Sequence, residues 1–352
     1  RVDSYALKEA LEKAREISGW RDKKGKLPPG RGIGVGNGGF VSGAGYPCYR
    51  TDLPQAVAII KDHDDGSMAT LYTGAVEIGQ GSDTVLLQMA AEAMGYPLEK
   101  MRIVASDTDL ATHDFGAYAS RQTLMSGWAV KKAGEEIKDK ILKTAAEMML
   151  VVPEQLDVKQ GIVFLKAHPE ESLTFEEVAR TYFVKYGQLI GQGSYKPPKL
   201  GGTFKGAAVG TSPAYSAATQ VAEVEIDEET GEIKVIEAWD VHDCGMVINP
   251  ALLHAQVHGA FYMGMGESIW EEVLFDENGD VANGNLAEYR MPTALDMPPV
   301  TSELVDSIDP NAPWGVKEVG EGATTPTMAC LANAIYDAMG VRIESLPLTY
   351  EK

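Results

Sequence analysis

The stretch "QAVAIIKDHDDGSMATLYTGAVEIGQG" at residues 55–81 decides the fold class. Two apolar runs rich in β-branched residues flank Asp65-Gly66, a dipeptide typical of the turn between antiparallel strands. A helix is predicted directly afterwards, because Ser82 can cap its N-terminus and Gly95 can end it. This part of the chain is therefore expected to form a hairpin followed by a helix.

The same order of signals returns in "VAEVEIDEETGEIKVIEAWDVHDCG" at residues 221–245. An acidic turn with Gly231 separates two strand-like runs, and the helical "NPALLHAQVHGAFYMGMG" follows at residues 249–266. Two such units in one chain predict two similar lobes. Because hairpins dominate over regular βαβ repeats, the predicted fold class is α+β with much antiparallel strand.

Three segments are expected along the chain: a lead-in helix and connector at 1–30, a first lobe at 31–200 and a second lobe at 201–352. The boundary near Gly201 rests on the Pro and Gly density of "GQLIGQGSYKPPKLGG". A long amphipathic helix is predicted at about residues 126–149, inside the first lobe.

Composition excludes several classes of protein. The 352 residues are 44% hydrophobic and 23% charged, as in ordinary globular proteins. The net charge of −20 disfavours a nucleic-acid or anionic-membrane surface, which requires clustered Lys and Arg. No apolar run reaches the ~18–20 residues of a membrane span. The three cysteines, Cys48, Cys244 and Cys330, form no zinc spacing or disulfide framework, which indicates a reducing cytoplasm.

Gly34–Gly39 contains G-x-G-x-x-G, the pattern of a dinucleotide-binding loop. Such a loop has to follow a buried strand and open a helix. Here the pattern follows a Pro-rich connector and continues into "FVSGAGYP", so we interpret it as a glycine-rich loop or strand.

Two segments of the first lobe are candidate ligand loops. Gly79-Gln80-Gly81 lies between a strand and a helix N-terminus, where free N–H groups attract anions. The alternative for this segment is a tight strand-to-helix turn. In "DFGAYASRQT", Arg121 can grip a phosphate and Ser120 and Gln122 offer neutral donors. The alternative for this second segment is a loop that caps the following helix.

The third candidate is "KEVGEG" at residues 317–322. Glu321 lies between two glycines, and a carboxylate in a partly buried loop is a natural general base. Glu318 is interpreted as a solvated surface residue. A helix is expected after the loop, with Thr325 as N-cap and Gly340 at its end. His254 and His258 have i, i+4 spacing but no third ligand, which favours an ordinary helix face over a metal site.

Five motifs, taken in order, resemble the molybdenum-cofactor-binding large subunit of the xanthine oxidase family of molybdenum hydroxylases. The resemblance covers nearly the whole chain from Arg31 onward. The motifs are "GIGVG" (32–36), "VEIGQGSDT" (76–84), "GAYASRQT" (116–123), "DCGMVINPALLHAQVHGAFYMGMG" (243–266) and "GVKEVGEG" (315–322).

The resemblance implies the molybdopterin-binding fold of the xanthine oxidase/aldehyde oxidoreductase type. It implies a molybdenum atom carried by molybdopterin cytosine dinucleotide, with no protein ligand to the metal. The glutamate matching Glu321 is the family's base beside the molybdenum, and Tyr118 and Ala119 are candidates for the substrate pocket. The cofactor-binding positions are expected at Gly79, Gln80, Gly81, Ser120, Arg121, Gln122, Gln256 and Gly320.

The sequence departs from the family in what it lacks. A "GGGFGG"-type loop and an Arg-Gly-Phe segment are missing, as are the four cysteines of a [2Fe–2S] cluster and a flavin site. The chain is therefore expected to be the C-terminal half of a catalytic subunit in a heteromeric complex. An N-terminal half or companion chain would complete it, with [2Fe–2S] clusters and FAD on partner subunits.

The C-terminal third, with "LAEYRMPTALDMPP", "DPNAPWGVKEVGEG" and "ANAIYDAMGVRIESLP", resembles the 4-hydroxybenzoyl-CoA reductase branch of the family. That branch removes a phenolic hydroxyl. Aldehyde, purine and N-heterocycle hydroxylases of the same family remain alternatives. Two other classes stay open: a nicotinamide-dependent dehydrogenase and a non-catalytic assembly subunit, and the presence of Glu321, Gln80 and Arg121 together counts against the latter.

Overall fold

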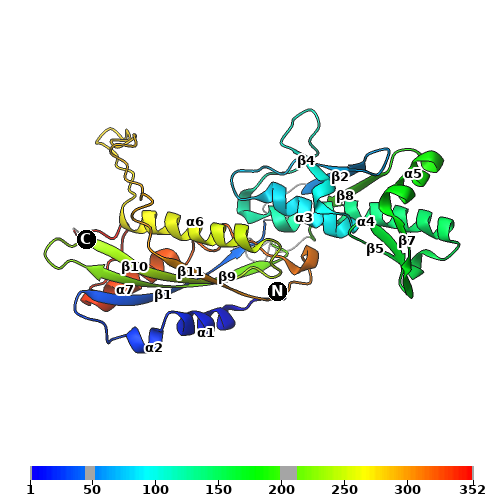
Figure 1. Cartoon of the computed structure of the whole chain (residues 1–352). Helices are drawn as coiled ribbons and strands as arrows, with labels where there is room; N and C mark the ends of the chain where they lie inside the picture. Colours follow the sequence, from blue (N-terminus) through cyan, green and yellow to red (C-terminus); the bar gives the residue numbers. More distant parts are fainter. Residues whose placement is uncertain (1, 44–51, 199–211, 351–352) are drawn as a thin grey trace. The chain divides into compact units, whose positions relative to one another are not determined.

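The computed structural model describes residues 2–43, 52–198 and 212–350, and the chain divides into two compact units (Figure 1). One unit comprises Ser42–Pro213 and Pro310–Val316; the other comprises Val2–Val41, Ala214–Asp309 and Lys317–Lys352. Among helices of the described residues, none combines the length and apolar character needed to cross a membrane.

The first unit is built on a four-stranded sheet in the order β4-β3-β2-β8. The predicted hairpin is confirmed, since β2 and β3 pair antiparallel, and helix α3 leads from β3 to the parallel strand β4. Helix α4 packs against β8 and β2. These elements are β2 (Ala56–Asp62), β3 (Ala69–Thr73), α3 (Ser82–Met94), β4 (Met101–Ala105), α4 (Gln122–Met149) and β8 (Ile190–Tyr195).

A smaller antiparallel sheet and a helix are inserted between α4 and β8. Thr174 caps this helix: its hydroxyl accepts the N–H of Glu177, whose carboxylate accepts the N–H of Thr174 in return. The inserted elements are β5 (Leu156–Lys159), β6 (Ile162–Leu165), β7 (His168–Thr174) and α5 (Phe175–Tyr186).

The second unit has a four-stranded sheet in the order β1-β9-β10-β11. Strands β9 and β10 form the second predicted hairpin, and α6 leads from β10 to the parallel strand β11. The elements are α1 (Leu7–Ile17), α2 (Trp20–Lys23), β1 (Arg31–Val41), β9 (Tyr215–Ile226), β10 (Ile233–Asp243), α6 (Pro250–Ile269), β11 (Val300–Val305) and α7 (Thr327–Met339).

Both faces of the second sheet are covered by helices. Ala222 and Val224 of β9 lie in one apolar core with side chains of α6 and α7, whereas Val221 lies in another with Ala10 and Ala14 of α1. This alternation follows from the period of two along a strand. The predicted α+β class is therefore confirmed, with antiparallel hairpins and one parallel crossover in each unit.

Glycine-rich strands let a helix pack directly on each sheet. A Cβ at Gly34 of β1 would collide with backbone atoms of Ala334 and Cys330 in α7. In the first unit, a Cβ at Gly193 of β8 would collide with the carbonyl oxygen of Ala129 in α4. The "GIGVG" stretch is thus part of a strand on which a helix packs. This agrees with its interpretation as a glycine-rich loop or strand.

The domain boundaries differ from the predicted ones at the N-terminal side. Strand β1 was expected in the lobe 31–200, but it pairs with β9 from Arg31↔Glu225 to Val41↔Tyr215 and belongs to the second unit. The lead-in helix α1 also packs on that sheet. The unit to which β1 belongs is decided by its pairing with residues far along the chain, and local sequence signals do not show that pairing. The predicted boundary at Gly201 lies outside the described residues.

Candidate cofactor-binding site

The Gly79-Gln80-Gly81 turn connects β3 to α3, as predicted, with Gly79 at φ +104° and Gly81 at φ +83°. Three backbone N–H groups converge on the carboxylate of Glu77: those of Gly79 (2.8 Å), Gly81 (2.9 Å) and Asp83 (3.1 Å). Desolvation alone would raise the pKa of Glu77, but these hydrogen bonds together lower it. The turn is therefore built to hold an anionic oxygen.

Gln80 joins this turn to the second candidate loop. Its amide Nε2 donates to Gln122 Oε1, and both Gln80 and Gln122 donate from Nε2 to the carbonyl oxygen of Val76, at 2.8 and 3.0 Å. Gln122 is the first residue of α4 and is only 5% exposed. The structure thus brings the Gly79–Gly81 turn and the Ser120–Gln122 loop together in one unit.

Arg121 behaves differently from the expectation that its guanidinium faces a phosphate. Its side chain is 0% exposed and forms an ion pair with Asp114 at 2.5 Å. The guanidinium also donates to the carbonyl oxygens of Gly116 (2.7 Å) and Gln55. Asp114 is held in turn by the hydroxyl of Ser126 at 2.7 Å. In this geometry the side chain of Arg121 stabilises its own loop. Any contact of this loop with a ligand therefore has to come from groups other than the Arg121 side chain.

The loop braced by Arg121 has a strained backbone. Ala119 and Ser120 both lie in the left-handed region, at φ 52° and 49°, and the carbonyl oxygen of Ala119 accepts the N–H of Gly43 at 2.8 Å. Strained non-glycine residues cluster at functional sites. Tyr118 is half-buried, with the Arg121 guanidinium 5.6 Å from its ring centre. That Tyr118 and Ala119 line a substrate pocket stays a prediction.

In the second unit, Glu321 lies in the turn before α7 and its side chain is exposed within this chain, not partly buried as predicted. Its carbonyl oxygen accepts the N–H of Thr324 at 3.1 Å. Gly320 is half-buried beside it, and Gln256 lies half-exposed on α6. The predicted helix is confirmed as α7 (Thr327–Met339), with Gly340 in the left-handed conformation at its end. Its N-cap residue is Pro326, not Thr325 as predicted.

Glu318 was interpreted as a surface residue, and this interpretation is wrong. Its side chain is 2% exposed, and its carboxylate accepts the hydroxyl of Ser216 and the N–H of Gly322 at 3.1 Å. The preceding residue, Lys317, forms a fully buried ion pair with Asp243 at 2.7 Å. The only sequence signal for the burial of Glu318 was the glycine four residues later, and this signal is weak by itself.

His254 and His258 share a hydroxyl group on the neighbouring strand. Ser302 of β11 lies 2.6 Å from His254 Nδ1 and 3.2 Å from His258 Nε2. Burial, with a smaller contribution from His254, lowers the pKa of His258. The described residues contain no group of three potential metal-ligating side chains.

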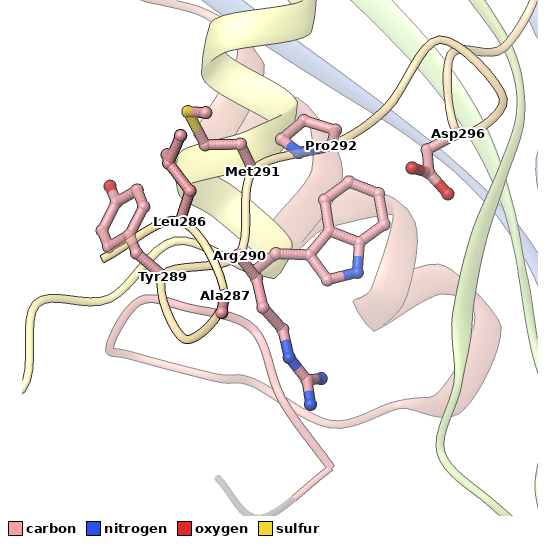
Figure 2. Close-up of a pocket in the computed structure, with 8 residues that line it drawn as sticks. Leu286, Ala287, Tyr289, Arg290, Met291, Pro292 and Asp296 are labelled. Carbon is pink, nitrogen blue, oxygen red and sulfur yellow. The ribbon is translucent and has the colours of Figure 1, made fainter. Parts of the chain in front are cut away.

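A cavity of about 330 Å³ lies between the end of α6 and the segment that leads to β11 (Figure 2). None of the site residues predicted above lines it. Its lining residues are Trp270, Leu286, Ala287, Tyr289, Arg290, Met291, Pro292 and Asp296.

Comparisons with known proteins agree with these features. The family described as "Molybdopterin cofactor-binding domain" matches residues 10–298. The xanthine dehydrogenase molybdenum-binding subunit of Escherichia coli O157:H7 is 34% identical over 99% of this chain and 46% of its own length. The 6-hydroxypseudooxynicotine dehydrogenase complex subunit gamma of Paenarthrobacter nicotinovorans is 30% identical over 98% of this chain and 42% of its own length.

Among solved structures, quinoline 2-oxidoreductase from Pseudomonas putida 86 superposes with a TM-score of 0.88 and 26% identity, covering 99% of this chain and 45% of that one. The chain thus spans slightly less than half the length of the relatives it matches. The family match over most of the chain, supported by the similarity of fold, shows that this chain belongs to the molybdopterin cofactor-binding domains of the xanthine oxidase family of molybdenum hydroxylases.

Proposed function

We propose that this chain is the C-terminal part of the catalytic subunit of a molybdenum-dependent oxidoreductase that works as a multi-subunit complex. The observation that carries the proposal is the contact between Gln80 and Gln122, which joins two candidate cofactor loops in one unit. A protein kept only for assembly would need neither that junction nor a carboxylate at Glu321. The relatives named above support the same class of function.

The residues of the first unit fit an anionic cofactor. The N–H groups of Gly79 and Gly81, with that of Asp83 in α3, hold the carboxylate of Glu77, which supports the proposal that this turn accepts negative oxygen. A Cβ at Gly79 or Gly116 would meet nothing within 4 Å, so these positions leave room beside the backbone. We infer that these glycines, with the amides of Gln80 and Gln122, hold the pterin and its dinucleotide tail.

Further contacts are assigned to Ser120, Gln256 and Gly320, and to the backbone of Arg121. We propose the cytosine dinucleotide form of molybdopterin, on the resemblance of the sequence. When bound, this cofactor supplies the two-electron oxidation or reduction of the substrate carbon.

Glu321 is proposed as the general base. Its carboxylate is exposed within this chain, so a group supplied by the cofactor or the substrate can reach it. A base positioned for proton transfer contributes about 10²–10⁴ in rate. Tyr118 and Ala119 are proposed to line the substrate pocket, since they lie on the strained loop, three and two residues before Arg121.

The proposed substrate is an electron-poor aromatic carbon, such as that of an N-heterocycle. The names of the relatives, xanthine dehydrogenase and quinoline 2-oxidoreductase, support this class. Reductive removal of the phenolic hydroxyl of 4-hydroxybenzoyl-CoA is the second candidate, supported by the motifs in the C-terminal third of the sequence. Aldehyde oxidation remains a third substrate class within the same family.

The proposed partners are the N-terminal half of the subunit or a companion chain, a [2Fe–2S] subunit and an FAD subunit. A reducing cytoplasm suits the buried, free thiols of Cys244 and Cys330.

The test uses the complex purified with its native partners. We expect about one molybdenum per chain, iron, and cytidine monophosphate after acid hydrolysis. An intact complex without molybdenum would overturn the proposal. Oxidation of N-heterocycles and reduction of 4-hydroxybenzoyl-CoA, assayed separately, distinguish the two substrate candidates.

Glu321→Gln tests the role of the base in the same complex. Turnover should fall about 10²–10⁴-fold while molybdenum content stays that of the wild type. Glu229→Gln, an exposed position in the turn between β9 and β10, is the matched control and should leave both unchanged. Loss of molybdenum in Glu321→Gln would make this residue a structural one.

A further inference from the structure

Glu318 connects the loop of Glu321 to β9, an inner strand of the second sheet. Its two carboxylate oxygens have different partners: one accepts the hydroxyl of Ser216 on β9, and the other accepts the N–H of Gly322 at 3.1 Å. Ser216 is 0% exposed and Glu318 is 2% exposed. The bond to Gly322 therefore lies in a site shielded from water, where a hydrogen bond is stronger than in water.

The backbone of Glu318 is fixed as well. Its carbonyl oxygen lies 3.1 Å from Nε2 of His242 on β10, and a carbonyl can only accept. Nε2 must therefore carry the proton in this contact. Burial lowers the pKa of His242 to about 4, so the ring is neutral at ordinary pH and keeps this tautomer. The side chain of Glu318 is thus bonded to β9, and its backbone carbonyl is bonded to β10.

Gly322 completes the arrangement. A Cβ at this position would collide with Oε1 of Glu318 and lie 2.7 Å from the hydroxyl of Ser216. The second glycine of "VGEG" therefore makes room for the carboxylate of Glu318. On the other side, the N–H of Lys317 donates to the carbonyl oxygen of Cys244 at 2.7 Å, and its ammonium pairs with Asp243.

Glu321 lies between these anchors. Residues 317, 318 and 322 are buried and bonded, whereas the side chain of Glu321 is exposed. Burying a carboxylate costs several kcal/mol, so an apolar residue at 318 would be expected if only stability mattered. We infer that Glu318 is a positioning residue: it fixes the turn so that the carboxylate of Glu321 is presented in one orientation. This inference rests on the function proposed above for Glu321.

The test compares Glu318→Gln and Ser216→Ala with the wild type in the molybdenum-loaded native complex. In Glu318→Gln one of the two accepting oxygens becomes an amide NH₂, which cannot accept from Gly322 or Ser216, and in Ser216→Ala one donor is removed; both variants keep nearly the same volume. We expect kcat to fall by about 10–100-fold in Glu318→Gln, because a displacement of about 1 Å has that effect, with KM and molybdenum content unchanged. Ser216→Ala should show the same split with a smaller fall.

A second measurement does not depend on activity. Hydrogen–deuterium exchange of peptides covering residues 316–326 should be faster in both variants, because the N–H of Gly322 loses its partner or that partner loses its support. Peptides of β9 and β10 should keep their wild-type exchange. Glu229→Gln is the matched control and should show wild-type kcat and exchange.

The outcomes separate the two claims. An inactive, molybdenum-loaded wild-type complex would refute the proposed function and leave the exchange data to judge the anchoring of the loop. An active wild type together with wild-type kcat and exchange in Glu318→Gln would overturn this inference alone. If Glu318→Gln does not fold, Ser216→Ala decides: wild-type kcat and exchange there would also overturn it.

Discussion

The loops that lead into α4 and α7 occupy equivalent places in the two units, and they are braced in different ways. Each follows the parallel edge strand, β4 or β11, and precedes the helix that packs on a glycine-rich strand. In the first unit Arg121 pairs with Asp114, seven residues away within the same loop. In the second unit Lys317 pairs with Asp243, 74 residues away at the end of β10.

The chain order of the two units also differs. The glycine-rich strand comes last in the first unit, as β8, and first in the second unit, as β1. The sheets are otherwise the same: a hairpin, a crossover helix and a parallel strand. The comparison teaches that the last strand of the same sheet can come from either end of the chain segment. It also teaches that the loop before the packed helix can be fixed either locally or by a distant strand.

The largest effect is expected from breaking the two buried ion pairs. Arg121→Met and Lys317→Met each leave a buried carboxylate without its cation, which should lower the free energy of unfolding by about 3–5 kcal/mol. Chemical denaturation measures this. Lys143→Met is the control, because the exposed pair Lys143–Asp139 is worth about 0.5 kcal/mol or less. A loss below about 1 kcal/mol in one buried variant alone would show that the two ion pairs are not equivalent, and such a loss in both would contradict the prediction.

Adding a methyl group to the glycine-rich strands tests the shared packing. Gly34→Ala and Gly193→Ala place a Cβ against the backbone of α7 and α4, which should cost about 1–3 kcal/mol or more. Gly259→Ala on α6 is the control: a Cβ there meets nothing within 4 Å and should be neutral or stabilising by up to about 1 kcal/mol. Thermal unfolding of the three variants decides whether the two strands are equally intolerant.

Each unit also holds a buried acid whose pKa is raised. Burial raises the pKa of Asp62 to about 8, with a smaller contribution from Asp65, and burial raises that of Asp240 to about 7. Between the unfolded and folded pKa values the folded state binds more protons, so the free energy of unfolding should fall as pH rises from about 4 to 7 or 8. This contribution is complete at low pH and lost at high pH.

Asp62→Asn and Asp240→Asn should each flatten that slope, by a few kcal/mol across the range. Urea denaturation at several pH values measures it. Asp280→Asn, an exposed position, should leave the slope unchanged. A wild-type stability that does not change between pH 4 and 8 would contradict the prediction for both units.

The smallest effect on stability is expected at Glu77, the carboxylate that holds the Gly79–Gly81 turn. Because this side chain is exposed, Glu77→Gln should cost about 1 kcal/mol or less. Faster hydrogen exchange in residues 76–83 and lower molybdenum content should accompany it. Unchanged exchange would mean that the turn holds its shape without Glu77, in contrast to the dependence on Glu318 inferred for the other loop.

Local signals were sufficient for much of the fold. The turn residues around Gly66 and Gly231 predicted both hairpins, and α3 and α6 follow them as expected. The glycine turn before α3 was also recognised, because a Gly-Gln-Gly sequence ahead of a helix has few other uses. Its own anchor, Glu77, was not recognised, since a glutamate two residues before a glycine carries no distinctive pattern.

Burial of charged residues was where sequence reasoning failed. Arg121 was expected to face a ligand and Glu318 to face solvent, yet both are buried. Whether a charged side chain is buried depends on its partner, and that partner can be far away in the sequence. Glu318, for example, accepts a hydrogen bond from Ser216, which is 102 residues away. For Glu321, the sequence correctly placed the residue in a loop before a helix, but not its exposure in this chain.

The sequence by itself determined the two hairpins, the helices after them and the family, because turn residues, strand alternation and glycine-rich motifs act over a few neighbouring positions. Only the tertiary structure decided that β1 completes the second sheet and that Asp114, Asp243 and Ser216 hold the loops that lead into α4 and α7. Strand pairing and burial of charge are set by contacts between distant residues, whose energies are fixed by the folded neighbours and not by the local sequence.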